Sequence, residues 1–238
     1  MNIPILPEDT RLLVMCSSKG RPFKLKDLIE SVYLNRSKGT ELVVYVAEDD
    51  PCLEEYKPVL ESVPHIIGPN RSMVQVLNFL STEAYPNIKY YTDLNDDHYV
   101  VTPRWDDMLI QILEKSGGWK WVALKSQLGL PTAALVCGNV VRTIGHYYYP
   151  YFVQSHVDNT QLEYEKAGLL VWADNVTVEH RHFIFGKSEK DATYARMCTQ
   201  ANFNHGLGVF EHWCREERDK EFQKIFIARE SYEKRNKE

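Results

Sequence analysis

The chain has 238 residues, of which 44% are hydrophobic and 26% charged, and its formal net charge is -5. A chain of this length and composition folds into a globular protein with a substantial core, which excludes a disordered or fibrous protein. The acidic balance argues against a protein whose main task is to grip nucleic-acid backbone over a wide basic face.

The five cysteines are scattered along the chain and show no CxxC or CxxH spacing. They predict reduced thiols rather than a disulfide framework or a zinc knuckle. The first ten residues lack the basic and apolar regions of a signal peptide, and no run of about 18 apolar residues occurs. We therefore expect a cytoplasmic protein without a membrane span.

The first half of the chain alternates between short apolar runs and helical patterns. We predict strands at about 11–16, 41–47, 63–67 and 88–92, separated by helices at about 25–33, 52–60 and 72–80. Strands that alternate with helices in this way form right-handed βαβ units. The pattern predicts a single α/β domain with a mostly parallel central sheet that is covered on both faces.

The second half is less regular. It predicts helices at 103–115, 139–144 and 160–167, and strands at 119–125 and 130–137. We expect residues 169–173 and 176–178 to form a hairpin or strand pair. From Ser188 the chain reads as helical, with a break at Gly206–Gly208 before a helix at 209–226, and residues 229–238 read as a solvated or frayed tail.

An acidic cluster follows the predicted strand at 88–92. Asp93, Asn95, Asp96, Asp97 and His98 lie within six residues, and charge packed this densely needs a counter-ion. On an open surface water and salt would screen the cluster. At the carboxyl end of a central strand, a hard divalent cation is the expected partner of the carboxylates.

Two further loops follow predicted strands, at 17–21 and 48–50. Because the carboxyl ends of parallel strands meet at one edge of the sheet, these loops and the acidic cluster are expected to open onto the same edge. This topology favours a metal site over a screened surface cluster.

Two features of the second half also bear on a site. Asp158 stands at the start of the helix predicted at 160–167, where it could act as an N-cap or as a functional carboxylate. His180 and His182 alternate on an extended segment and point the same way, which suits a metal site or a hydrogen-bonded strand end. The aromatic run at 146–152 is read as packing rather than as a stacking platform.

Five landmarks follow one another along the chain: the loop 17–22, the acidic end of the second strand, Asn95–His98 with Thr102–Trp105, Val157–Asn159, and Glu179–His182. Together they resemble the ordered landmarks of GT-A fold glycosyltransferases. The resemblance covers about residues 11–215 and is closest to small family-2-like enzymes of bacteria and phages with a Gly-Asp-Asp-His-x-x-x-x-Thr-Pro-Gly-Trp pattern. In this chain Asn95 and Arg104 replace the two glycines of that pattern.

The resemblance implies a GT-A-like (Rossmann-like) three-layer sandwich. Residues 11–100 would form the nucleotide-sugar-binding half, residues 101–215 the acceptor half, and residues 216–238 a charged C-terminal helix or tail. It also implies a nucleotide-diphosphate sugar as donor and a divalent cation, Mn2+ or Mg2+, as cofactor. The compartment would be the cytoplasm of a bacterium or of a phage-infected host.

The resemblance also assigns roles to residues. Asp97 is the expected metal ligand, with His180 or His182 as a further ligand, and Asp158 is the expected general base of an inverting transfer. Asp93 is expected to support the site from a buried position. The expected donor-binding residues are Ser17, Arg21, Asp49, Asp50, Arg71 and Asp96, of which Asp96 is also a candidate ligand.

Two other classes of protein remain open at this point. A sugar-phosphate nucleotidyltransferase would share the sheet and the carboxylates, but it should carry a glycine-rich basic loop after its first strand, and residues 17–22 hold one glycine. A non-catalytic nucleotide- or carbohydrate-binding module would not explain the clustered acid. The acceptor is open among a hydroxymethylated base of phage DNA, for which Lys187, Lys190 and Arg196 offer a local basic patch, a surface glycan and a protein.

Overall fold

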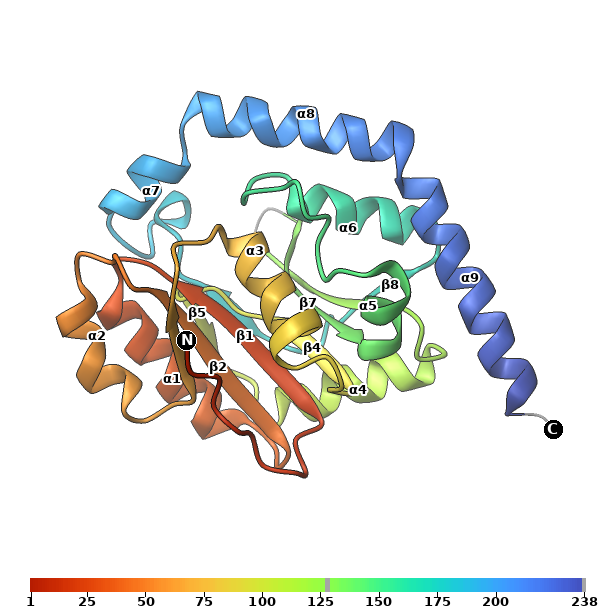
Figure 1. Cartoon of the computed structure of the whole chain (residues 1–238), viewed down its shortest axis with the longest axis horizontal. Coiled ribbons are helices and arrows are strands. Elements are labelled where there is room, and N and C mark those ends of the chain that lie inside the picture. The colour runs from red at the N-terminus through yellow and green to blue at the C-terminus, as the bar shows by residue number, and fades with distance from the viewer. Residues whose placement is uncertain (127–128, 237–238) are drawn as a thin grey trace.

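The computed structural model describes residues 1–126 and 129–236 and shows a central sheet between two layers of helices (Figure 1). The sheet has the strand order β3-β2-β1-β4-β7-β6-β8. Every strand is parallel to its neighbours except β7, which is antiparallel to β4 and β6. The strands are β1 (Leu12–Ser18), β2 (Thr40–Ala47), β3 (His65–Gly68), β4 (Tyr90–Asp93), β6 (Trp121–Lys125), β7 (Pro131–Cys137) and β8 (Leu170–Trp172).

Helices cover both faces of this sheet (Figure 1). One layer contains α1 (Pro22–Asn35), α2 (Leu53–Leu60) and α4 (Trp105–Lys115). The other contains α3 (Met73–Asn78), the π-helical turn η1 (Phe79–Ala84), α5 (Gly138–Ile144) and α6 (Val157–Lys166). The predicted three-layer α/β architecture with a mostly parallel sheet is therefore confirmed.

The interior strands β1 and β2 are nearly continuous apolar runs because helices cover them on both sides. Their core residues are fully buried, and Met15 pairs with Val43 in the parallel register. On the next layer, α3 begins with a capping box in which Ser72 and Gln75 satisfy each other's backbone N–H groups. Apolar periodicity and capping thus explain most of the first half of the fold.

The carboxyl ends of β1, β2 and β4 lie at one edge of the sheet. Ser18 is in register with Val46, and Met15 with Asp93, so the loops that follow these strands open onto the same side. The convergence of three loops predicted from the sequence is confirmed.

The predicted hairpin of residues 169–173 and 176–178 is wrong. Residues 170–172 form β8, which joins the edge of the main sheet beside β6 in parallel. Residues Val178–His180 form β9, which pairs with β5 (His98–Val100) in a separate antiparallel two-stranded sheet. Each segment finds a distant partner, and this second pairing places His180 opposite His98.

The C-terminal region consists of helices. After the 3-10 turn η2 (Phe183–Phe185) come α7 (Ala192–Met197), α8 (Gln200–Glu216) and α9 (Arg218–Arg235). In Figure 1, α8 crosses above α6 and α9 descends beside α5. No helix in the described part of the chain is both long and apolar enough to cross a membrane.

One prediction for this region is wrong. The break expected at Gly206–Gly208 does not occur, because α8 runs through both glycines and the change of direction falls at Glu217 instead. The segment 229–238, expected as a solvated or frayed tail, is exposed from Glu230 to Asn236, but it is helical as far as Arg235, since it continues α9 beyond the buried residues Phe222 and Ile225.

Candidate active site

A cavity of about 490 Å3 lies at the edge where β1 and β4 end. We call it the basic cavity, because four of its lining residues are Lys19, Arg21, Arg71 and Arg196. Its lining also includes the carboxylates of Asp96 and Asp97 together with Ser17, Asn70, Asn95, His180, His182 and Tyr194. Basic and acidic side chains therefore line the same small cavity.

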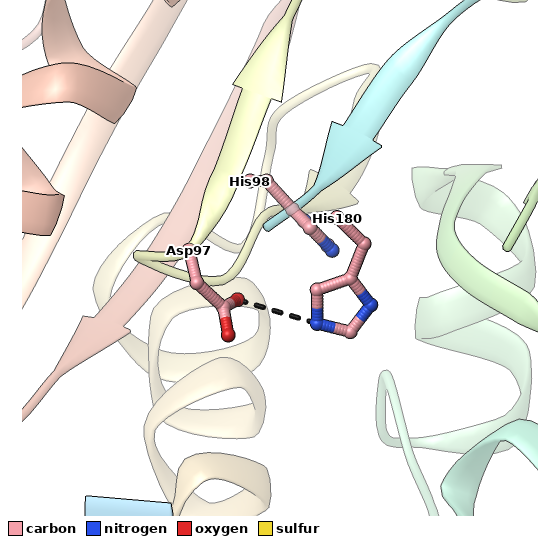
Figure 2. Close-up of side chains that lie close together, drawn as sticks. All are labelled: Asp97, His98 and His180. Atoms are coloured by element: carbon pink, nitrogen blue, oxygen red, sulfur yellow. Dashed lines mark ion pairs between the residues drawn. The ribbon is translucent and has the colours of Figure 1, made fainter. Parts of the chain in front are cut away.

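Asp97 and His180 both line this cavity, and their side chains point toward each other (Figure 2). Oδ1 of Asp97 lies 3.4 Å from Nε2 of His180, and the two residues come from the loop after β4 and the end of β9. Asp97 is 4% exposed, and its Oδ1 makes no hydrogen bond to any residue that the structure describes. Burial alone would raise the pKa of Asp97, but the neighbouring His180 and His98 bring it below its ordinary value.

His98 completes a group of three residues whose ligand-type atoms lie within 4.8 Å of one another. Both of its ring nitrogens are already used, however. Nδ1 accepts a hydrogen bond from the backbone N–H of Asn95 (3.1 Å), and Nε2 lies 2.9 Å from Oγ1 of Thr132. Burial lowers the pKa of His98 to about 3, so the ring is neutral and its proton is on Nε2.

Thr132 links the two histidines. Its Oγ1 accepts the Nε2 proton of His98 and lies 3.0 Å from Nδ1 of His180. A hydroxyl oxygen has two lone pairs, so it can also accept a proton from Nδ1 of His180, which would leave Nε2 of His180 free as a ligand atom. His98 therefore orients His180 through Thr132 instead of acting as a ligand.

Asp97 and His180 are suited to bind a divalent cation. A buried carboxylate oxygen without a hydrogen-bond partner is costly in a folded protein, and here it faces an imidazole nitrogen whose ring is held from behind. A cation between Oδ1 of Asp97 and Nε2 of His180 would satisfy both atoms. His182, the other predicted ligand, uses Nδ1 to accept from the N–H of Ile184, and burial lowers its pKa to about 4.

Asp96 lies beside Asp97, but its two oxygens are occupied by the protein. Oδ2 accepts from the hydroxyl of Ser18 (2.8 Å) and Oδ1 from Nη1 of Arg21 (3.1 Å). Burial raises the pKa of Asp96 to about 6, and the charge of Asp97 acts in the same direction. Asp96 lines the basic cavity and at the same time holds the loop after β1 through Ser18 and Arg21.

Arg21 is held on two further sides. Its Nε and Nη2 both donate to the carboxylate of Asp191 at 2.9 Å, and its guanidinium lies 3.9 Å below the ring of Tyr194. The Tyr194 hydroxyl in turn donates to Oδ2 of Asp97 (2.6 Å). Helix α7 and its N-cap residue Asp191 thereby close over the loop after β1.

A second cavity, of about 440 Å3, adjoins the basic cavity. We call it the Asp158 cavity, after the predicted base in its wall. Met73, Asn95, Gln154, His180, His182 and Cys198 line both cavities. Asp158 is not the N-cap of α6, which is His156, and burial raises the pKa of the Asp158 carboxyl.

Asp93 lies at the end of β4, deep in the wall of the Asp158 cavity. Its Oδ1 accepts hydrogen bonds from the hydroxyls of Tyr147 (2.9 Å) and Tyr148 (3.2 Å). Burial raises its pKa to about 6. The first tyrosines of the run at 146–152 are thus buried packing residues that also hold Asp93, whereas Tyr151 is 69% exposed.

The remaining predicted donor residues divide into two groups. Ser17 and Arg71 line the basic cavity, where Arg71 stacks over the ring of Phe79. Asp50 does not reach the cavity, because its carboxylate accepts from the backbone N–H groups of Gly20 and Cys52. Asp49 does not line the cavity either, but it accepts a hydrogen bond from the amide of Asn70, which does.

Several residues of the site were not found from the sequence. Thr132 carried no local signal, because only the antiparallel insertion of β7 brings it between His98 and His180. Tyr194 comes from a helix whose docking the sequence does not reveal. Lys19 lies within the loop 17–22, and the only feature of the sequence that could have marked it as a site residue is its charge directly after a predicted strand. Of the basic patch considered for DNA, Lys187 pairs with Glu179 (3.7 Å) and Arg196 lines the basic cavity.

The arrangement of sheet, helices and loops is the GT-A-like fold of glycosyltransferases. The mannosyltransferase PcManGT from Pyrobaculum calidifontis, solved with GDP-Man and Mn2+, matches 96% of this chain and 77% of its own at 11% identity, with a TM-score of 0.56. The 1–349 fragment of TarS from S. aureus matches 94% of this chain and 91% of its own at 10% identity, with a TM-score of 0.55.

The likeness to these structures is one of fold. The chain spans 36% of the longer TarS structure and 60% of the TarS structure that contains UDP. No protein-family profile matches the sequence, and no curated protein is detectably similar to it.

Proposed function

We propose that the protein is a metal-dependent glycosyltransferase that moves a sugar from a nucleotide-diphosphate sugar to an acceptor hydroxyl, with inversion at the anomeric carbon. The observation that carries this proposal is the pair of adjoining cavities. The basic cavity is lined by lysine and arginine side chains and by the Asp97–His180 pair. The other cavity is lined by Asp158, and His180 lines both. The complexes of structural neighbours with UDP and with GDP-Man and Mn2+ support a donor of this kind.

The basic cavity suits the diphosphate of the donor. Lys19, Arg71 and Arg196 would contact phosphate oxygens. Among the described residues, none of these three side chains lies as close to a carboxylate as Arg21 lies to Asp191, so their charges are more available to a ligand. Arg21, with Asp96 and Asp191 around it, would fix the shape of the loop after β1. Ser17 lies on the same wall.

Asp97 and His180 would hold the cation. A carboxylate paired with an imidazole suits Mn2+ better than Mg2+, which prefers an all-oxygen octahedron. When bound, the cation would neutralise negative charge that develops on the leaving diphosphate.

Asp158 would act as the general base. Its carboxylate would accept the proton of the acceptor hydroxyl while that oxygen attacks the anomeric carbon, and the bond to the diphosphate oxygen would break on the opposite side. Burial raises the pKa of Asp158, which brings a carboxylate closer to the strength that a general base needs.

Thermal unfolding with a panel of UDP, GDP and other nucleotide sugars, with and without Mn2+, tests the donor site. We expect one nucleotide class to raise the melting temperature, and only when Mn2+ is present. Asp97→Asn should remove that Mn2+-dependent shift, whereas Asp219→Asn, at an exposed carboxylate on α9, should keep it. A panel without any stabilisation would reject the donor site. With pyrophosphate added to the nucleotide sugar, formation of a nucleoside triphosphate and a sugar phosphate would favour a nucleotidyltransferase.

A further inference from the structure

Gln161 is a buried polar residue without a partner in the wall of the Asp158 cavity. It is 1% exposed, and neither its amide nitrogen nor its amide oxygen makes a hydrogen bond to a residue that the structure describes. It follows Asp158 by three residues on α6, so both side chains project from the same face of the helix.

An unpaired buried amide needs an explanation. Leaving one such group unsatisfied costs about 1–3 kcal/mol, so most buried polar side chains in folded proteins have a partner. A hydrophobic residue would fill the same volume without that cost. A carboxamide offers a donor beside an acceptor, which matches a hydroxyl-bearing ring or the edge of a base.

The charge of the cavity narrows the class of ligand. Among the described residues that line it there is no lysine or arginine, while Asp93 and Asp158 are both present. The basic cavity next to it has four cationic side chains. A phosphate or another anion would therefore be attracted more strongly to the basic cavity than to the Asp158 cavity, in which His156, His180 and His182 are the only described lining residues that can become cationic.

The other lining residues suit an uncharged ring. Tyr148, Phe185 and Phe203 supply aromatic surface, and Gln154 and Asn159 supply further amides. The volume of about 440 Å3 lies within the range of about 300–1,000 Å3 that is common for small-molecule sites.

We infer that the part of the acceptor that enters the Asp158 cavity is an uncharged, hydroxyl-bearing ring, and that the carboxamide of Gln161 recognises it. This inference rests on the proposed function. Two sources carry such chemistry, a sugar of a glycan and a hydroxymethylated base. In either case the acceptor hydroxyl loses its proton to Asp158, its oxygen bonds to the anomeric carbon, and the diphosphate leaves with the electron pair of the broken bond.

A third cavity gives the rest of the acceptor an exit. It has a volume of about 350 Å3 and shares Gln154, Ser155, Cys198 and Phe203 with the Asp158 cavity. Its described lining also lacks lysine and arginine. The unit attached to the acceptor ring would lie along the start of α8.

The first experiment compares acceptors on the unaltered protein. With the donor found by thermal unfolding, kcat/KM is measured for p-nitrophenyl glycosides, for the same glycosides phosphorylated on the ring, and for 5-hydroxymethyl pyrimidine nucleosides. We expect transfer to one of the two uncharged sets, with at least about 10-fold lower kcat/KM for the phosphorylated glycosides. Preference for phosphorylated rings, or donor hydrolysis without transfer to either uncharged set, would overturn the inference.

The second experiment tests Gln161 itself. Gln161→Leu, and Gln161→Met as a second variant of similar volume, should raise KM for the uncharged acceptor about 10-fold and leave donor hydrolysis and Mn2+-dependent stabilisation unchanged. Gln223→Leu, at an exposed glutamine of α9, is the matched control. An unchanged acceptor KM in both Gln161 variants would show that the amide binds water only. If the unaltered protein neither binds nor hydrolyses a nucleotide-sugar donor, the proposed function itself is rejected.

Discussion

The hydroxyl of Tyr194 donates a hydrogen bond of 2.6 Å to Oδ2 of Asp97. Tyr194 lies on α7, and this bond fixes one oxygen of the carboxylate so that the other, Oδ1, is turned toward His180. The same tyrosine ring lies 3.9 Å above the guanidinium of Arg21. Tyr194 thus orients Asp97, the proposed metal ligand, and also stacks on the guanidinium of Arg21.

Tyr194→Phe tests this relationship. The change removes the hydroxyl and keeps the ring over Arg21, so the fold should persist while Asp97 becomes free to rotate. Loss of such a supporting hydrogen bond typically weakens metal binding by about 10–100-fold. We expect the Kd for Mn2+, measured by isothermal titration calorimetry, to rise within that range.

The control for Tyr194→Phe is Tyr151→Phe, which alters an exposed tyrosine outside the linings of the basic and Asp158 cavities. It should bind Mn2+ as the unaltered protein does. Equal Mn2+ affinity in both variants would mean that Tyr194 does not position the ligand.

Asp158→Asn separates the acceptor step from donor binding. The amide keeps the size of the side chain but cannot accept a proton, so transfer should fall by about 100- to 10,000-fold while nucleotide-dependent stabilisation persists. Because burial raises the pKa of Asp158 above 3.8, transfer by the unaltered protein should decline as the pH falls through that raised value. Full transfer activity in the variant would remove Asp158 from the reaction.

The sequence predicted the parts of the fold that local patterns determine. Continuous apolar runs such as β2 and capping residues such as Ser72 specify an element and its neighbours along the chain. The convergence of the first three loops followed from the parallel topology, and it brought Ser17 and Asp97 into one cavity.

Pairings between distant segments could not be predicted in this way. The three-residue strands β5 and β9 have too few residues to show alternation, and their pairing places His180 beside Asp97. Nor could the sequence show that Arg21, which lines the basic cavity, is also held by Asp191, or that Asp50 accepts from the backbone N–H of Gly20. Charge after a strand can bind a ligand or hold another loop, and only the partner residues, here Asp191 and the backbone N–H of Gly20, decide between the two.

The two glycines of α8 give a matched pair of stability tests. A Cβ at Gly208 would meet no atom within 4 Å, so Gly208→Ala should stabilise the helix by about 0.5–1 kcal/mol through the lower entropy of the unfolded chain. A Cβ at Gly206 would lie 2.7 Å from the carbonyl oxygen of Ser155 and 2.8 Å from Nδ1 of His156. Gly206→Ala should therefore destabilise the protein by about 1–3 kcal/mol, because α8 must move away from the loop before α6.

Urea unfolding of both alanine variants measures these changes in the free energy of unfolding. Opposite signs are expected from two identical substitutions in one helix. If Gly206→Ala is as stable as Gly208→Ala, then α8 does not pack against residues 155–156 as closely as described.

Glu221 and His146 form a buried pair whose state depends on pH. Nε2 of His146 lies 3.1 Å from Oε1 of Glu221, and Tyr164 donates to Oε2. Burial raises the pKa of Glu221 to about 7 and lowers that of His146 to about 4. Between these values both groups are neutral, so the protonated carboxyl donates to the imidazole and no ion pair forms.

This pair predicts a loss of stability as the pH rises. The folded-state pKa of Glu221 exceeds its ordinary value of 4.5, so its contribution is fully present below pH 4.5 and is lost as the pH rises through about 7, by up to about 3 kcal/mol. Glu221→Gln imitates the protonated form. In urea unfolding between pH 4.5 and 8, the variant should match the unaltered protein at the acidic end and become increasingly more stable than it up to about pH 7, above which the difference should level off.

The titration of His146 acts in the opposite direction, since a lowered pKa costs stability as the pH falls below its ordinary value of 6.5. Both proteins carry this histidine, so the difference between them reports Glu221 together with its contact to His146. Glu230→Gln, at an exposed position of the same helix, should leave the pH dependence unchanged. A constant difference between Glu221→Gln and the unaltered protein across this pH range would mean that Glu221 is ionised in the folded state throughout and forms a true ion pair with His146.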